Sequence, residues 1–212
     1  MNIRVIQWNI SFKCNPEKIA ELLSRNIRGY TIINLQEVLE TTYSKISSLL
    51  CASDSAYSLD FRKAGAYEGK NRKMGVATFV FGGRISCNEL VSRSVFPERA
   101  LFSKIKFQDK DVSVLNFHSL TGVDYKKAKS SNFASIADYI HDCPEMDFFT
   151  CDANEPKVDS LNDEKIEFWN NRDKGFNAGL LFGKTTAHSM HDAYKTYLSN
   201  NNIDVQTTPL AI

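Results

Sequence analysis

Along the first part of the chain, apolar residues fall alternately at the spacing of strands and at the spacing of helices, which predicts alternating strands and helices. Residues 3–10 are apolar on both faces of an extended chain, which is typical of a strand inside a sheet. Asn15 before Pro16 is a helix-start signal, because Asn caps a first turn and Pro lacks the N–H that would be unsatisfied there. Residues 30–35 form a β-rich run. We therefore expect Glu37 to stand just past the carboxyl end of a strand.

The middle of the chain is predicted to be mostly strands, and strands that follow one another without helices pair antiparallel. The predicted strands are residues 58–62, 74–81, 90–96, 100–107 and 112–118, with a later strand at 146–151. The predicted helices are residues 130–141, 160–169 and 188–198. Neither a repeat nor a linker-like segment interrupts the pattern, so residues 1–212 are expected to form a single domain.

The composition is that of an ordinary globular protein. Hydrophobic residues make up 42% of the chain, and 26 basic residues stand against 25 acidic ones. Such a chain is not disordered, and it lacks the broad positive field that drives non-specific binding to nucleic acids or membranes. A nucleic-acid ligand would therefore have to be held by a local patch.

The cysteines and the N-terminus bear on where the protein works. The five cysteines are scattered without a Cys-x-x-Cys pair, so neither a disulfide framework nor a zinc site is expected. The N-terminus lacks the basic flank and apolar block of a signal peptide, and no segment is apolar over the length of a membrane span. We expect a soluble protein of the reducing cytoplasm.

Polar residues gather at or just beyond four predicted strand ends. The four runs are Trp8-Asn9, Gln36-Glu37, Asn116-Phe117-His118 and Cys151-Asp152-Ala153-Asn154. Any one of them is explained by the need of strands to surface and by the preference of Asn and Asp for turns. Together they supply the hard oxygen ligands that Mg²⁺ prefers, and Mg²⁺ held by carboxylates is a usual device for phosphate-ester chemistry.

Five ordered segments resemble the motifs of the endonuclease/exonuclease/phosphatase superfamily, the group that includes pancreatic-type deoxyribonuclease and the abasic-site endonucleases. The segments are Ile-Arg-Val-Ile-Gln-Trp-Asn9, Ile-Ile-Asn-Leu-Gln-Glu37-Val, Met-Gly-Val-Ala-Thr-Phe-Val, Val-Leu-Asn-Phe-His118-Ser and Asp152-Ala-Asn154-Glu-Pro. The resemblance implies an α+β fold, built as a four-layer α/β/β/α sandwich of two mixed β-sheets. It also implies a phosphoesterase site at one edge that uses Mg²⁺, with Mn²⁺ as the alternative ion.

The resemblance further implies a role for each matching residue. Glu37 would be the principal Mg²⁺ ligand, and Asn9 would be its neighbour around the metal or its waters. Asp152 would orient or deprotonate the attacking water, and Asn154 would help to hold the phosphate or the nucleophile. His118 would hydrogen-bond a phosphate oxygen.

Arg99 follows from a weaker match. It stands in the segment Phe-Pro-Glu-Arg-Ala, where relatives sometimes carry an Arg that contacts phosphate. Pairing with Glu98, or a surface ion pair, is the alternative. The spacing of His188 and His191 would put both on one face of the predicted helix 188–198, which suits a metal. A histidine pair without a carboxylate partner is, however, more often a surface feature than a metal site.

The chain departs from the family pattern in two places. Cys151 stands where relatives have Gly before the Asp of Asp-x-Asn, which changes the local backbone but spares the ligands. The family also ends with an Asp-containing strand and then a Ser-Asp-His motif, and neither occurs here. We therefore expect the C-terminal strands of the second sheet to be missing or atypical and the domain to be truncated at its C-terminal end.

The leading hypothesis is a Mg²⁺-dependent phosphoesterase that hydrolyses phosphodiester bonds as a nuclease. One alternative is a phosphomonoesterase acting on an inositol phosphate, a nucleotide or another small phosphate ester, which the near-neutral charge favours. Another is a catalytically inactive family member or fragment that acts as a binding domain. The expected partner is accordingly a nucleic acid or a small phosphate ester. Five aromatic residues are assigned to the core rather than to base stacking: Phe61, Phe81, Phe102, Phe107 and Trp169.

Overall fold

The computed structural model describes residues 1–64, 73–121, 126–169, 173 and 175–203. The chain folds into two compact units. The first consists of Met1–Ser119 and Glu145–Asp152, and the second of Leu120–Pro144 and Ala153–Ile212. Among the described residues, no helix is both long and apolar enough to cross a membrane.

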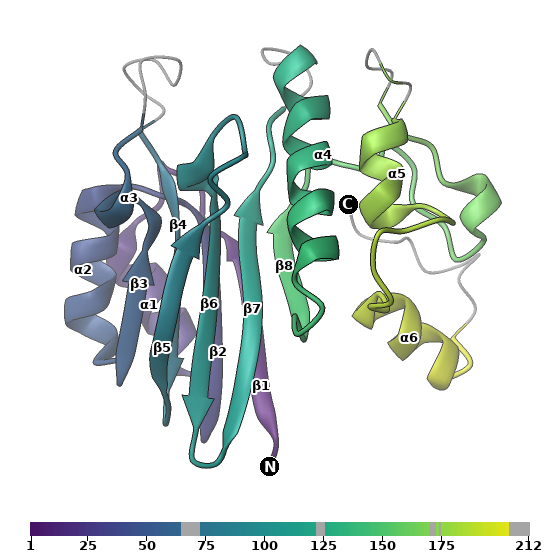
Figure 1. Ribbon diagram of the computed structural model, residues 1–212. Coiled ribbons are helices and arrows are strands. Elements are labelled where there is room, and N and C mark those ends of the chain that lie inside the picture. The colour runs from purple at the N-terminus through teal and green to yellow at the C-terminus, as the bar shows by residue number, and fades with distance from the viewer. Residues whose placement is uncertain (65–72, 122–125, 170–172, 174, 204–212) are drawn as a thin grey trace. The chain divides into compact units, whose positions relative to one another are not determined.

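A mixed sheet opens the first unit (Figure 1). Its strands are β1 (Ile3–Asn9), β2 (Tyr30–Val38), β3 (Asp54–Tyr57) and β4 (Gly75–Phe81), and they lie in the order β1-β2-β4-β3. β1 and β2 are parallel, whereas β4 pairs antiparallel with both β2 and β3. The parallel pair requires a crossover, which the first helix of the chain provides.

A second mixed sheet belongs to the same unit. Its strands are β5 (Arg84–Leu90), β6 (Ala100–Phe107), β7 (Lys110–His118) and β8 (Phe148–Asp152), in that order. β5, β6 and β7 pair antiparallel, and β7 and β8 are parallel. A short 3₁₀ helix, η2 (Pro97–Arg99), leads into β6. Each sheet therefore contains one parallel pair whose carboxyl ends lie together.

Two helices cover the outer face of the first sheet. α1 (Pro16–Ser24) begins where the sequence predicts, because the Asn15 side chain accepts a hydrogen bond from the Lys18 N–H. Apolar side chains of α1 and α2 (Glu40–Leu50) share a core with β2 and β4: Ile19, Leu23, Ile46, Leu50, Ile33, Leu35 and Phe79. A one-turn helix, α3 (Ser58–Phe61), follows β3.

The inner faces of the two sheets pack on each other. Their shared core contains Ile32 and Val80 from the first sheet and Ile105, Phe107 and Val114 from the second. Burial of such side chains is the main favourable term in folding. The predicted α+β fold with two mixed β-sheets is confirmed.

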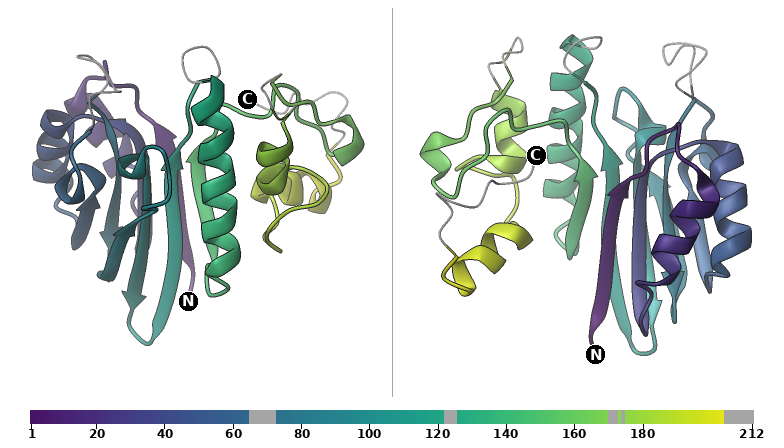
Figure 2. Two further views of the ribbon diagram at one scale, coloured as in Figure 1. Left: turned by 45° about the horizontal axis from the view of Figure 1, so that its top comes forward. Right: turned by 180° about the vertical axis from the view of Figure 1, so that it is seen from behind.

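The second unit carries helices joined by irregular segments (Figure 2). Its helices are α4 (Lys126–Asp142), η3 (Asp163–Lys165), α5 (Phe176–Phe182) and α6 (Ala193–Asn200). α4 and α5 lie side by side, and the rings of Phe133 and Phe182 meet edge to face 6.1 Å apart. A single antiparallel bridge joins Val158 to Glu167.

Two of the predicted strands are wrong. Residues 58–62 form the turn of α3, in which the buried Ser58 hydroxyl accepts a hydrogen bond from the Val76 N–H. Residues 90–96 are mostly turns, and the strand lies earlier, at β5. β5 is at the edge of its sheet and carries Arg84, Ser86 and Glu89, so its hydrophobic pattern is weak.

Two of the predicted helices also need correction. Residues 160–169 contain only η3 and one residue of the Val158–Glu167 bridge. α6 starts at Ala193, because the Asp192 side chain caps it by accepting from the Lys195 N–H. His188 and His191 therefore precede the helix, and their predicted common helical face is wrong.

The predicted core positions of the five aromatic residues are correct for three and wrong for two. Phe102 and Phe107 are buried and Phe81 is partly buried, as predicted. Phe61 and Trp169 are each 52% exposed, so their predicted place in the core is wrong. Amphipathic rings next to loops are hard to place from pattern alone, because a single exposed aromatic residue is common.

Candidate active site

The parallel pairs of the two sheets end at matching positions. In the first sheet Asn9 lies opposite Gln36, and in the second His118 lies opposite Asp152. All four residues belong to the first unit, and hydrogen bonds and close contacts join the two strand ends across the sheets. The predicted meeting of polar strand ends is thus present for Asn9, Glu37, His118 and Asp152.

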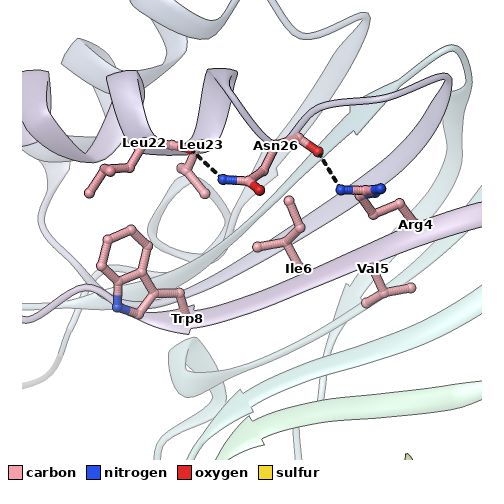
Figure 3. A pocket seen from close by; sticks show the side chains of 7 residues that line it. All are labelled: Arg4, Val5, Ile6, Trp8, Leu22, Leu23 and Asn26. Carbon is pink, nitrogen blue, oxygen red and sulfur yellow. Dashed lines mark hydrogen bonds between the residues drawn. The ribbon is translucent and has the colours of Figure 1, made fainter.

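Alternation along β1 aims its side chains at two different places. Arg4, Ile6 and Trp8 line a pocket of about 420 Å³ between β1 and the end of α1, together with Val5, Leu22, Leu23 and Asn26 (Figure 3). Gln7 and Asn9 alternate with Ile6 and Trp8 along the strand, and Gln7 donates to Gln36 while Asn9 donates to Asp152. None of the predicted site residues is among the described residues that line this pocket.

A bulge at the end of β2 presents Glu37. The β2–β4 register shifts between Leu35 and Val38, and Glu37 has a φ of 58°, in the left-handed region that non-glycine residues rarely adopt. Its Oε2 accepts a hydrogen bond of 3.1 Å from the Phe12 N–H, and its side chain is 20% exposed. The carboxylate is therefore held in place while part of it stays open to solvent.

Asp152 is oriented by Asn9. The Asn9 Nδ2 donates to Asp152 Oδ2 at 2.5 Å, and Asn9 Oδ1 accepts from the Ser11 N–H at 2.9 Å. The backbone around Asp152 is fixed by the Ser119 N–H, which donates to its carbonyl at 2.8 Å. Both polar atoms of the Asn9 side chain are thus engaged within the protein. The role of Asn9 beside a metal stays a prediction. Its hydrogen bond to Asp152 could not be predicted from the motif.

His118 lies between the two carboxylates. Its Nε2 is 3.8 Å from Glu37 Oε1 and 3.9 Å from Asp152 Oδ2, and its side chain is only 4% exposed. Burial, and then the positive charge of Arg99, lower the pKa of His118 to about 4, although the two carboxylates act in the opposite direction. The imidazole is therefore neutral at pH 7. Its Nδ1 is buried and has no hydrogen-bond partner among the described residues.

Arg99 is an interior residue. It is 4% exposed, its guanidinium carbon lies 5.7 Å from the centroid of the Phe96 ring, and its charge reaches His118. The neighbouring Glu98 is also buried, and Arg62 Nε lies 3.6 Å from its Oε2. The alternative of a surface ion pair is wrong, because Arg99 is not at the surface. Its charge is instead placed beside the candidate site.

Buried amides behind the site join the two sheets. Gln7 Nε2 donates to Gln36 Oε1 at 2.8 Å, and Gln36 Nε2 donates to Asn116 Oδ1 at 2.7 Å. Asn116 Nδ2 donates in turn to the carbonyls of Leu35 and Ala77. Gln36 precedes Glu37, and Asn116 stands two residues before His118, so this network fixes the strand segments that carry the site. Sequence reasoning missed Gln7. Its only signal is a polar residue among apolar ones in residues 3–10, which were predicted to lie inside a sheet but form the edge strand β1.

Comparison with known proteins identifies the fold. The chain matches no protein-family model, and no curated protein matches it by sequence. Solved structures do match. A humanized D. rerio TDP2 carrying 14 mutations is 11% identical with a TM-score of 0.56, over 72% of this chain and 66% of that one. TDP2 from Caenorhabditis elegans is 17% identical with a TM-score of 0.54, over 72% of this chain and 48% of that one.

A third matching structure is that of a protein named as a member of the family. An endonuclease/exonuclease/phosphatase family protein from Bacteroides thetaiotaomicron is 14% identical with a TM-score of 0.50, over 71% of this chain and 62% of that one. The chain has the endonuclease/exonuclease/phosphatase fold. It spans less than two thirds of the length of each of these three structures.

The donor set at the strand ends of this endonuclease/exonuclease/phosphatase fold fits a hard divalent cation. Glu37 and Asp152 offer carboxylate oxygens, each side chain is partly open to solvent, and Asn9 binds one of the carboxylates. Mg²⁺ is commonly held by one or two carboxylates and keeps several waters. A closed group of three or more His, Cys, Asp or Glu ligands does not occur among the described residues. Two carboxylates with access to solvent suit a hydrated divalent ion, which completes its coordination with water.

Asn154 belongs to the second unit, two residues after Asp152. Its φ is 52°, and its carbonyl accepts a hydrogen bond of 2.7 Å from Lys129 Nζ. Lys129 also lies 3.0 Å from Glu155 Oε1, and the two side chains are 1% and 0% exposed. Trp169 N–H donates to the other oxygen of Glu155. Helical spacing gives a signal for this pair, because Lys129 falls on the same face of α4 as Phe133, Ile136 and Ile140.

Proposed function

We propose that the chain is a metal-dependent phosphoesterase that hydrolyses phosphodiester bonds. One observation carries the proposal. Glu37 and Asp152 each have a carboxylate oxygen within 4 Å of the same buried imidazole nitrogen of His118, at the edge where the parallel strands of both sheets end. Two partly exposed carboxylates beside buried nitrogen donors are the groups that metal-assisted attack on a phosphate needs.

In this proposal Glu37 and Asp152 would hold Mg²⁺, or Mn²⁺ in its place, with Asn9 next to them. Mg²⁺ would supply neutralising charge for the phosphate and a water of lowered pKa. The Phe12 N–H and the Asn9 amide keep the two carboxylates from turning away. Their function is to set the geometry before the substrate arrives.

The remaining residues would act on the substrate. Asp152, aimed by Asn9, would orient the attacking water and take its proton. Neutral His118 would donate a hydrogen bond to a phosphate oxygen, and the nearby charge of Arg99 would favour the extra negative charge that grows on the phosphate during attack. Asn154 is proposed to help hold the phosphate.

A nucleic-acid strand is the proposed substrate. Support comes from a D. rerio TDP2 structure, 11% identical with a TM-score of 0.55, that is described as complexed with a single-stranded DNA product. The near-neutral charge of this chain instead favours a phosphomonoesterase acting on a small phosphate ester. The two substrate classes are separated by the same assay, run with an oligonucleotide and with a nucleotide monophosphate. A catalytically inactive binding domain would bind Mg²⁺ or an oligonucleotide without turning either substrate over.

The decisive variant is Glu37→Gln, which keeps the shape of the side chain and removes its charge. We expect Mg²⁺-dependent, EDTA-sensitive hydrolysis of bis-p-nitrophenyl phosphate by the unaltered chain. Glu37→Gln should lower kcat by about 100-fold or more, because the ion loses a ligand at the reacting phosphate. Glu40→Gln is the matched control, because Glu40 is exposed and pairs with Lys63 instead. Equal activity of the two variants would refute the site.

A further inference from the structure

A buried ion pair of the second unit stands next to Asn154. Lys129 Nζ lies 3.0 Å from Glu155 Oε1, and the two side chains are 1% and 0% exposed. The other carboxylate oxygen of Glu155 accepts a hydrogen bond of 3.0 Å from the Trp169 N–H. Two charges taken out of water are expensive, and an apolar pair of similar volume is often at least as stable. Stability alone therefore does not explain why this pair is charged.

The ammonium group of Lys129 also holds the backbone of Asn154. Its Nζ donates to the Asn154 carbonyl at 2.7 Å. Asn154 has a φ of 52°, in the left-handed region that non-glycine residues rarely adopt, so its surroundings must keep it there. An apolar side chain in place of Lys129 would fill similar space but could not donate this hydrogen bond. Lys129 thus fixes the carbonyl, and Glu155 balances its charge.

Lys129 is supported by the packed face of α4. It falls on the same helix face as Phe133 and Ile136, which are fully buried. Its Nζ lies 6.0 Å from the centroid of the Phe133 ring, which adds a favourable contact to the charge. A lysine side chain with 1% of its surface exposed is not placed to contact a substrate. An effect of Lys129 on the reaction would therefore have to act through Asn154.

We propose that Lys129 and Glu155 are positioning residues that set the direction of the Asn154 side chain. Because the backbone conformation of a residue determines where its side chain points, holding the Asn154 carbonyl also aims its amide. The inference rests on the proposed function, in which Asn154 helps to hold the phosphate. It adds two residues that contact neither the metal nor the substrate. Loss of the pair should let the Asn154 amide turn away from the phosphate, which weakens an oriented contact rather than the fold.

The uncharged variant Lys129→Met/Glu155→Gln tests this role without leaving one buried charge unpaired. Both substitutions keep the approximate shape of the side chain, and the new amide oxygen can still accept from the Trp169 N–H. The urea midpoint of the uncharged variant should therefore stay close to that of the unaltered chain. Its kcat/KM for bis-p-nitrophenyl phosphate should fall about tenfold, because one hydrogen bond to a charged group is lost. An unchanged kcat/KM with a lowered urea midpoint would show a purely structural pair and overturn the proposal.

An Asn154→Gly background separates positioning from a general loss of structure. Glycine tolerates the left-handed conformation and lacks the amide, so Asn154→Gly should itself lower kcat/KM about tenfold. Adding the uncharged variant to Asn154→Gly should cause no further loss, because the pair acts through that side chain. Lys195→Met is the matched control, because Lys195 Nζ lies 2.7 Å from Asp159 in another ion pair of the second unit. A further loss in the Asn154→Gly background would overturn the proposal, and so would an equal loss in Lys195→Met.

Binding of inorganic phosphate in the presence of Mg²⁺ gives a readout that needs no turnover. In a calorimetric titration the uncharged variant and Asn154→Gly should each bind phosphate about tenfold more weakly than the unaltered chain. Turnover and phosphate binding that are both unchanged in the uncharged variant would overturn the positioning role and leave the phosphoesterase intact. Phosphate binding that depends on the pair, without Mg²⁺-dependent turnover, would support the positioning role and overturn the proposed function. Neither turnover nor phosphate binding by the unaltered chain would overturn both.

Discussion

His118 shows how burial decides the protonation state of one side chain. Water would favour the charged imidazole in the acidic range, but the interior position beside Arg99 lowers the pKa to about 4. A neutral imidazole can donate one hydrogen bond and does not compete with a cation for Glu37 and Asp152. The motif Val-Leu-Asn-Phe-His118-Ser indicated His118 as a candidate site residue. Its charge state could not be predicted, because it depends on burial and then on the charge of Arg99, and neither can be read from the motif.

The lowered pKa of His118 predicts an acid-sensitive fold. The unfolded chain takes up the proton near pH 6.5, while the folded chain resists it down to about pH 4, so stability is full above about 6.5 and is lost as the pH falls through that window. The expected loss is about 2 kcal/mol at pH 5. Urea unfolding in EDTA at pH 7 and pH 5 measures it.

The control for this effect is a second histidine variant. His118→Gln should remove most of the loss between pH 7 and pH 5, whereas His141→Gln, at an exposed position near the end of α4, should keep it. An identical pH dependence in His118→Gln and the unaltered chain would contradict the assignment.

At the scale of the elements, amide side chains bind the strands of one sheet to those of the other. Gln36 of β2 reaches Asn116 of β7, and Asn34 of β2 is bonded to Thr78 and Thr150 of β4 and β8. Buried amides are expensive unless they are satisfied, so such contacts specify one arrangement of the sheets. β2 and β7 were predicted from their patterns, but their partners were not, because pairing across sheets leaves no trace in local periodicity.

The link between Gln36 and Asn116 can be tested by a double-mutant cycle. Gln36→Leu should destabilise the protein by about 2–3 kcal/mol, because it leaves the buried side-chain oxygen of Asn116 without its donor. Asn116→Leu should cost a similar amount. The double variant should cost less than the sum of the two, which urea unfolding would reveal as a coupling energy. Strictly additive losses would show that the contact does not join the sheets.

On the scale of the whole molecule, the sequence predicted the positions of most strands better than the turns between them. The five motif segments led to both mixed sheets and to four polar residues that the fold brings together: Asn9, Glu37, His118 and Asp152. The turn of α3 and the start of α6 escaped prediction because each depends on a buried polar contact or a cap. The edge strand β5 escaped it because its hydrophobic pattern is weak. Arg99 could be singled out from its sequence segment, but only the tertiary structure shows that it is buried.

The central claim is that Glu37 and Asp152 form one metal-assisted site for phosphodiester hydrolysis. Asp152 tests it most directly, because the proposed function makes it both a ligand of the metal and the group that takes the proton of the attacking water. The measurement is the Mg²⁺-dependent rate of cleavage of a single-stranded oligonucleotide by the unaltered chain, Asp152→Asn and the exposed control Asp109→Asn. We predict EDTA-sensitive cleavage that Asp152→Asn lowers by about 1000-fold and Asp109→Asn leaves unchanged. Cleavage by Asp152→Asn at the rate of the unaltered chain would contradict the account.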